Sequence, residues 1–187
     1  MTKRTFIAID IYPDEYLSNA IKNIRNHFDA ESIRWVTLDP AHITLAFLGD
    51  TTTEQIMFVK RVLKERLFCF GEFDIEVAGA GYFGKRHDPK VLWLGIVAND
   101  KLARLHTTVE AIIVEAGLVA DNKPFRPHLT LGRFRNYTGK SRIEKLPAIL
   151  GEATLMKRLI NELVFYESML KPEGPVYKPI EKVSLSW

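Results

Sequence analysis

The chain has 187 residues, of which 47% are hydrophobic and 26% are charged, and its formal net charge at pH 7 is +3. This length suits one domain or two small lobes with a shared core, and the composition excludes a disordered or fibrous protein. The single cysteine, Cys69, excludes an intrachain disulfide and favours a reducing compartment. The N-terminal apolar run is short and ends at Asp10, so we expect a cytoplasmic protein without a membrane span.

In chain order, the first half alternates between strand and helix patterns. Residues 5–11 form an apolar, β-branched run that predicts a strand, and Pro13 with the acidic residues after it begins a helix. Thr51 and Glu54 predict a capping box for a second helix with one apolar face. The other elements expected here are a short strand at 33–36, a strand that begins at 42 and an alternating strand at 72–78.

The second half of the chain repeats this plan. The expected elements are a strand at 91–97, a helix at about 99–116, a strand that begins at 128, and a closing hairpin whose arms at 161–170 and 181–187 flank a turn at 171–175. Gly117 is the residue expected to end the helix.

A single offset of 86 residues aligns both an opening strand and a later motif of the two halves. When the two halves are aligned at this offset, Phe6 corresponds to Leu92 and His42 corresponds to His128, which indicates an internal duplication. The sequence therefore predicts two strand-helix-strand units related by a pseudo-twofold axis. We expect one domain, residues 1–187, with lobes at about 1–86 and 87–187 and a C-terminal hairpin exchanged between them.

Two short motifs carry the same pattern of residues. "HITL" begins at His42 and "HLTL" begins at His128, so each histidine is followed two places later by a threonine. Residues two apart on a strand point to the same face, so each histidine and its threonine, Thr44 or Thr130, can contact the same ligand. A third match, "HTTV" at His106, falls in a helical pattern, where residues two apart diverge by about 200°. We interpret that match as a coincidence.

Two histidines with neighbouring hydroxyl groups fit acid-base chemistry on a phosphate. Histidine changes charge near neutrality, so one neutral ring can accept a proton while one protonated ring donates one. Threonine hydroxyls can donate hydrogen bonds to phosphate oxygens. The alternative is a pair of buried histidines bonded to backbone groups, which is common for single histidines and explains a matched pair poorly.

No metal or cofactor motif accompanies the pair in the sequence. The chain lacks His-Glu-x-x-His, Cys-x-x-Cys and Gly-x-x-x-x-Gly-Lys-Ser/Thr strings, and Cys69 in "LFCFG" is typical of apolar packing. His27 and His87 stand in charged, loop-like contexts. We therefore expect neither a metal nor a cofactor.

Positive charge gathers at residues 123–143, which contain six basic residues and no acidic one. This run has two open interpretations: a solvated loop face, or a local positive field for an anionic ligand.

The segments "RTFIAID", "HITLAFLG" and "FRPHLTLGR" resemble the two-histidine phosphoesterase superfamily, and within it the bacterial and archaeal RNA 2′,3′-cyclic phosphodiesterases, historically called 2′-5′ RNA ligases. The resemblance covers most of the chain. It implies an α+β fold of two lobes, with two mainly antiparallel sheets facing a central cleft and helices outside.

The resemblance also implies roles for individual residues. His42 would be the proton donor to the leaving ribose oxygen, and His128 the proton acceptor that activates water. Thr44 and Thr130 would bind the phosphate oxygens, and Arg133 would add positive charge beside them.

Three further residues are less clearly placed by the sequence. Strict strand alternation puts Arg133 on the core side, so Gly132 must allow a twist or bulge if Arg133 is to reach a phosphate. Phe47 matches a site-lining aromatic residue of the family, but the same alternation fits core packing equally well. Arg126, in "FRPH", is a candidate for the wall of the site.

The function that we expect is metal-independent hydrolysis of a ribose 2′,3′-cyclic phosphate, on an RNA end or a nucleotide, to a 2′-phosphate. The expected protein is a monomer. Two alternatives stay open: a 2′-5′ RNA ligase, which runs the same chemistry in reverse, and a module that binds RNA ends without catalysis.

Overall fold

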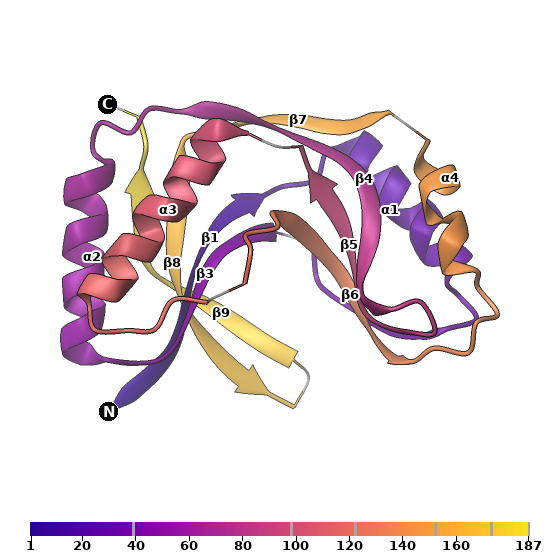
Figure 1. The fold of residues 1–187 in the computed structure, drawn as a ribbon, viewed down its shortest axis with the longest axis horizontal. Coiled ribbons are helices and arrows are strands. Elements are labelled where there is room, and N and C mark those ends of the chain that lie inside the picture. Colours follow the sequence, from indigo (N-terminus) through magenta and orange to yellow (C-terminus); the bar gives the residue numbers. More distant parts are fainter. Residues whose placement is uncertain (39, 98, 122, 152, 173, 187) are drawn as a thin grey trace.

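The computed structural model describes residues 1–38, 40–97, 99–121, 123–151, 153–172 and 174–186 (Figure 1). Its strands are β1 (Thr2–Ile11), β2 (Ser32–Trp35), β3 (Ala41–Thr52), β4 (Phe73–Lys85), β5 (Asp88–Ile96), β6 (His128–Asn136), β7 (Thr154–Ile160), β8 (Glu162–Lys171) and β9 (Gly174–Ser184). Its α-helices are α1 (Glu15–His27), α2 (Thr53–Leu67), α3 (Asp100–Glu115) and α4 (Leu146–Leu150), and a 3₁₀ turn, η1 (Ile143–Lys145), precedes α4. Glu173 and Trp187, which belong to the predicted closing hairpin, lie outside the described residues.

All of these strands belong to one antiparallel sheet in the order β7-β4-β5-β6-β3-β1-β8-β9, with β2 paired to β6. Strands β3 and β6 meet at a single register pair, Ile43 with Leu129. From this junction the two halves of the sheet diverge in Figure 1. The predicted α+β class with mainly antiparallel strands is confirmed, and the two expected sheets are joined at this pair into one.

The strand order is symmetric about that junction. Moving outward, one half-sheet runs β3, β1, β8, β9 and the other runs β6, β5, β4, β7. The offset of 86 residues carries β1 onto β5, β3 onto β6 and β4 onto β8, which are the strands at matching positions. We therefore propose that the fold is a duplicated unit in which β4 and β8 have exchanged halves.

The helices cover the outer side of the sheet, and each pair lies over one half (Figure 1). Helices α2 and α3 pack against each other and against the half that holds β3 and β9, whereas α1 and α4 pack against the half that holds β4 and β7. The aliphatic core fills the space between these helices and the sheet. The opposite face of the sheet is thus left for the site.

The helix ends follow the sequence signals closely, with one correction. Asp14 caps α1, and Gly117, with a φ of 72°, follows α3. The capping box of α2 is formed by Thr52 and Gln55 and not by Thr51 and Glu54. Thr51 is still part of β3, where its buried hydroxyl lies 2.7 Å from the hydroxyl of Thr5, so the cap moves one residue along the chain.

Candidate active site

The junction between β3 and β6 brings the two motifs together. Because these strands are antiparallel and Ile43 pairs with Leu129, one step along each strand sets His42 across from Thr130 and Thr44 across from His128. Ile43 and Leu129 are buried on the core side. The four motif side chains therefore share the other face.

A cleft of about 680 Å³ opens beside these four residues. A volume of this size is typical of sites for small ligands. The residues predicted for the site that line it are Thr44, Phe47, Arg126, His128, Thr130 and Arg133. His42 is half-buried and is not among the residues that line this cleft. Burial, and secondarily the charge of His128, lowers the pKa of His42.

His128 is held in the form of a proton acceptor. Its Nδ1 lies 2.6 Å from the backbone carbonyl oxygen of Arg126, and because a carbonyl oxygen only accepts, Nδ1 carries the proton and donates it. The free lone pair of the neutral ring is then on Nε2. Burial and the charge of Arg133 lower the pKa of His128, although the hydrogen bond to Arg126 opposes this.

His42 also stands among aromatic rings. Its ring lies 5.5 Å from the ring of Phe6 and 5.2 Å from that of Tyr177, centroid to centroid. This burial, with a smaller effect from the charge of His128, lowers the pKa of His42 to about 4. Both histidines are therefore neutral in the free protein at neutral pH, and a nearby anion would favour protonation of either ring.

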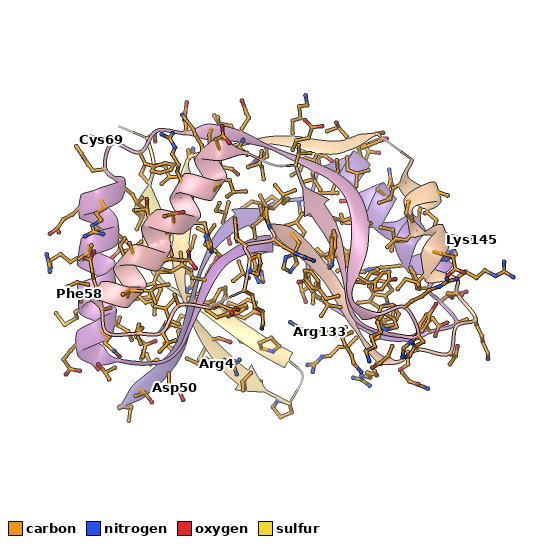
Figure 2. All side chains as sticks on the ribbon, in the orientation of Figure 1. Arg4, Asp50, Phe58, Cys69, Arg133 and Lys145 are labelled. Carbon is orange, nitrogen blue, oxygen red and sulfur yellow. The ribbon has the colours of Figure 1, made fainter. Side chains whose placement is uncertain are left out.

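Arg133 reaches the cleft through an irregularity in β6. Leu92 pairs with Gly132 and Trp93 pairs with Thr130, so Leu131 is an extra residue that shifts the alternation. The close approach of β2 explains the glycine, because a Cβ on Gly132 would lie 2.6 Å from Ile33 Cγ2. Figure 2 shows Arg133 where the two halves of the sheet diverge.

Phe47 reaches the cleft through the matching irregularity in β3. Its partner on β1 is Phe6, and the register between β1 and β3 shifts before this pair and again after the next pair, Ile7 with Ala46. The side chain of Phe47 is 60% exposed and lines the cleft. Between the two placements that the sequence left open, the structure has Phe47 at the cleft and not in the core.

His106 is in a helix, as predicted, but its ring still borders the cleft. It belongs to α3, and Thr108 donates to the carbonyl oxygen of Arg104 in the same helix, so the two side chains do not converge. The ring of His106 stacks on Phe125 at 3.9 Å between centroids, and both rings line the cleft. The "HTTV" match is therefore no third motif, although its histidine helps to form the wall.

Several aromatic residues of the site were not predicted from the sequence. Phe83 of β4 packs edge-on against His128 at 4.9 Å, and Tyr177 of β9 packs edge-on against His42 at 5.2 Å, between centroids. The predicted strands at 72–78 and 181–187 overlap β4 and β9, but neither range contains Phe83 or Tyr177, and which residues face the histidines depends on pairing between distant segments. Cys69 was expected to be packed, and it is exposed instead, because it lies just beyond the end of α2.

The ranges of residues that the structure describes hold no group of three or more His, Cys, Asp or Glu side chains that could bind a metal ion.

Within the same ranges, no helix combines the length and the hydropathy that crossing a membrane requires.

Comparison with known proteins gives a consistent set of relatives. A family model described as the 2′-5′ RNA ligase superfamily matches residues 13–163. The RNA 2′,3′-cyclic phosphodiesterase of Thermotoga maritima is 33% identical over 178 residues, which cover 94% of this chain and 91% of that protein. The RNA 2′,3′-cyclic phosphodiesterase of Methanothermobacter thermautotrophicus is 27% identical over 97% of this chain and 98% of its own length. Among solved structures, Escherichia coli LigT complexed with 3′-AMP aligns over 99% of each chain with a TM-score of 0.76 at 23% identity, a likeness that shows the fold.

Proposed function

Because the chain belongs to the 2′-5′ RNA ligase superfamily, we propose that it is an RNA 2′,3′-cyclic phosphodiesterase that works by acid-base catalysis with two histidines. The observation that carries this proposal is the pairing of Ile43 with Leu129, which brings two His-x-Thr motifs from distant parts of the chain to one face. The names of the related proteins agree with hydrolysis of a cyclic phosphate at an RNA end.

In the proposed reaction, water attacks the phosphorus atom and loses a proton to Nε2 of His128. The bond between phosphorus and the ribose 3′ oxygen breaks, and His42 gives its proton to that oxygen. The products are a 2′-phosphate and a 3′-hydroxyl group. Each proton transfer by a positioned side chain contributes about 10²–10⁴-fold to the rate.

Support for His128 as the base comes from its hydrogen bond to the Arg126 carbonyl oxygen, which leaves Nε2 free to accept a proton. For His42, the acid must be protonated although burial lowers its pKa to about 4. The anionic phosphate of the substrate supplies the opposite effect, since a negative charge beside the ring favours its protonated form. Binding of the substrate therefore favours the protonated form of His42, which can donate the proton.

Thr44 and Thr130 donate hydrogen bonds to the non-bridging phosphate oxygens in this proposal, and Arg133 balances their charge. Their shared support is that all three line the same cleft. Hydrogen bonds to a charged acceptor are about twice as strong as neutral ones, which suits the increase of charge on these oxygens in the transition state.

Turnover of adenosine 2′,3′-cyclic phosphate tests the proposed function. In excess EDTA the wild-type protein should form adenosine 2′-phosphate, because the two proton transfers need no metal ion. His42→Ala and His128→Ala should each lose most of this activity while keeping the circular dichroism spectrum of the wild type. Binding of the nucleotide without turnover would instead favour the non-catalytic RNA-end module.

The same site also permits the reverse reaction, which the name of the matching superfamily suggests. An RNA 5′-hydroxyl group would replace water, and a 2′-5′ linkage would form. Analysis of products with and without a 5′-hydroxyl RNA acceptor distinguishes ligation from hydrolysis.

We also propose that the substrate is an RNA or a nucleotide with a 2′,3′-cyclic phosphate end, and that the protein acts as a monomer in the cytoplasm. The lone cysteine, which permits no intrachain disulfide, agrees with a reducing compartment.

A further inference from the structure

We propose that Arg4 and Tyr177 form a second phosphate subsite, next to the reacting phosphate whose charge Arg133 balances, and that this subsite binds the phosphodiester on the 5′ side of the terminal nucleotide. The enzyme would then recognise the end of an RNA strand in preference to a free cyclic nucleotide. This inference rests on the proposed function and specifies its substrate.

Arg4 lies on the face of β1 that carries the catalytic cleft. The pairing of β1 with β8 is regular, with Phe6 opposite Tyr166 and Ala8 opposite Val164, and these four residues pack together. Alternate residues of a strand share a face, so Arg4 extends the row of Phe6 and Ala8 toward the end of the strand. In Figure 2, Arg4 lies on the strands left of the divergence and Arg133 lies near β6.

Tyr177 connects the catalytic acid to both arginines. Its ring packs edge-on against His42 and against Phe6, at 5.2 and 4.9 Å between centroids. Burial raises the pKa of Tyr177, while the positive charges of Arg133 and Arg4 lower it. Both guanidinium groups are therefore close enough for their charges to act on the phenol group, although they come from different halves of the sheet.

Neither arginine has an acidic partner within the part of the chain that the structure describes. By contrast, Lys3, the neighbour of Arg4, forms an ion pair of 2.7 Å with Glu167. Asp50 pairs with Arg4 in the strand register, but the two side chains form no ion pair. Cations that face a cleft without a carboxylate partner leave their charge available to an anionic ligand, and arginine suits phosphate because its planar fork can donate two hydrogen bonds.

The direction of the reaction determines which part of the substrate would meet these residues. His42 protonates the 3′ oxygen of the ribose, so the ribose lies on the His42 side of the phosphorus. The rest of the RNA is attached to that ribose through its 5′ oxygen, so the strand must extend from the site on the same side. Arg4 and Tyr177 belong to the half-sheet that carries His42. On the other side, His128 needs only a water molecule.

The test compares two substrates in three proteins. The substrates are adenosine 2′,3′-cyclic phosphate and the dinucleotide ApA with a 2′,3′-cyclic phosphate end, which adds one phosphodiester. The variant is Arg4→Gln, and the matched control is Lys3→Gln, which removes the same charge from the adjacent residue on the other face of β1. Both positions are exposed, so neither substitution disturbs the core.

The wild type and Lys3→Gln should have a higher kcat/KM for the dinucleotide than for the mononucleotide. Arg4→Gln should lose about tenfold or more on the dinucleotide, the effect of one hydrogen bond to a charged group, and should keep its rate on the mononucleotide. Its rate on the dinucleotide should also depend less on salt, because one phosphate contact is gone.

The proposal is wrong if Arg4→Gln slows both substrates equally, leaves the dinucleotide rate unchanged, or behaves like Lys3→Gln. Binding of adenosine 2′-phosphate and adenosine 2′,5′-bisphosphate gives a second readout that needs no turnover. The added 5′-phosphate should tighten binding in the wild type and in Lys3→Gln but not in Arg4→Gln. If the wild type turns over neither substrate, the proposed activity fails, and this binding comparison still decides the subsite.

Discussion

Protonation of His42 should destabilise the free protein, and the structure gives the size of the effect. Burial lowers the pKa of His42 from 6.5 in the unfolded chain to about 4 in the folded one. The unfolded state therefore binds the proton first, so the stability that comes from the neutral ring is complete above pH 6.5 and is lost as the pH falls toward 4. This difference in pKa corresponds to about 3 kcal/mol.

Urea unfolding at a series of pH values between 7.5 and 4, for the wild type and for His42→Gln, measures this loss. Carboxylates and the other histidines titrate in both proteins, so the difference between the two curves isolates His42 and its coupling to His128. The free energy of unfolding should fall more steeply in the wild type, by up to about 3 kcal/mol at pH 4. Parallel curves, or an NMR titration of the His42 ring with a midpoint at or above 6.5, would refute the reasoning.

Further predictions concern catalysis and stability. Thr44→Val and Thr130→Val should each lower kcat/KM by roughly 10–150-fold, because each removes one hydrogen bond to a charged group, and steady-state kinetics with unchanged circular dichroism would test this. The pH profile of kcat/KM should be bell-shaped with an optimum below 6.5, because the pKa values of both histidines are lowered in the free enzyme, whereas the optimum of kcat should be higher, since the bound phosphate raises both. Thr52→Ala should cost about 1 kcal/mol of unfolding free energy through loss of the α2 cap, measured by urea unfolding. Gly132→Ala should cost about 1–3 kcal/mol in the same assay, because its Cβ would overlap Ile33; unchanged midpoints would contradict the last two predictions.

The sequence indicated that the two histidine motifs would lie together because two local signals agreed. The strand period sets each histidine and its threonine on one face, and the offset of 86 residues puts both motifs on equivalent strands. Neither signal depends on knowing the pairing of distant segments. The shared face of the two motifs follows from the register of β3 with β6, which the duplication suggested but did not specify.

Features that depend on bulges or distant contacts were harder to predict. The alternation of side chains along β6 is shifted at Leu131. The face of the sheet on which Arg133 lies can therefore be determined only from the pairing of β6 with β5. Tyr177 on β9 reaches His42 on β3 across the two intervening strands, β8 and β1, and no local pattern in "PVYKP" shows this. Strand β7 (Thr154–Ile160) was not predicted, because its residues do not alternate cleanly between apolar and polar side chains.

The division of labour between the two histidines is tested most directly with a phosphodiester whose leaving group is p-nitrophenolate, which departs without a proton. The account predicts that His42→Ala, which lacks the acid, recovers much of its lost rate on this substrate relative to the cyclic phosphate. His128→Ala should stay impaired, because the attacking water still needs a base. Equal rescue of both variants, or of neither, would contradict the assignment of His42 as the acid and His128 as the base.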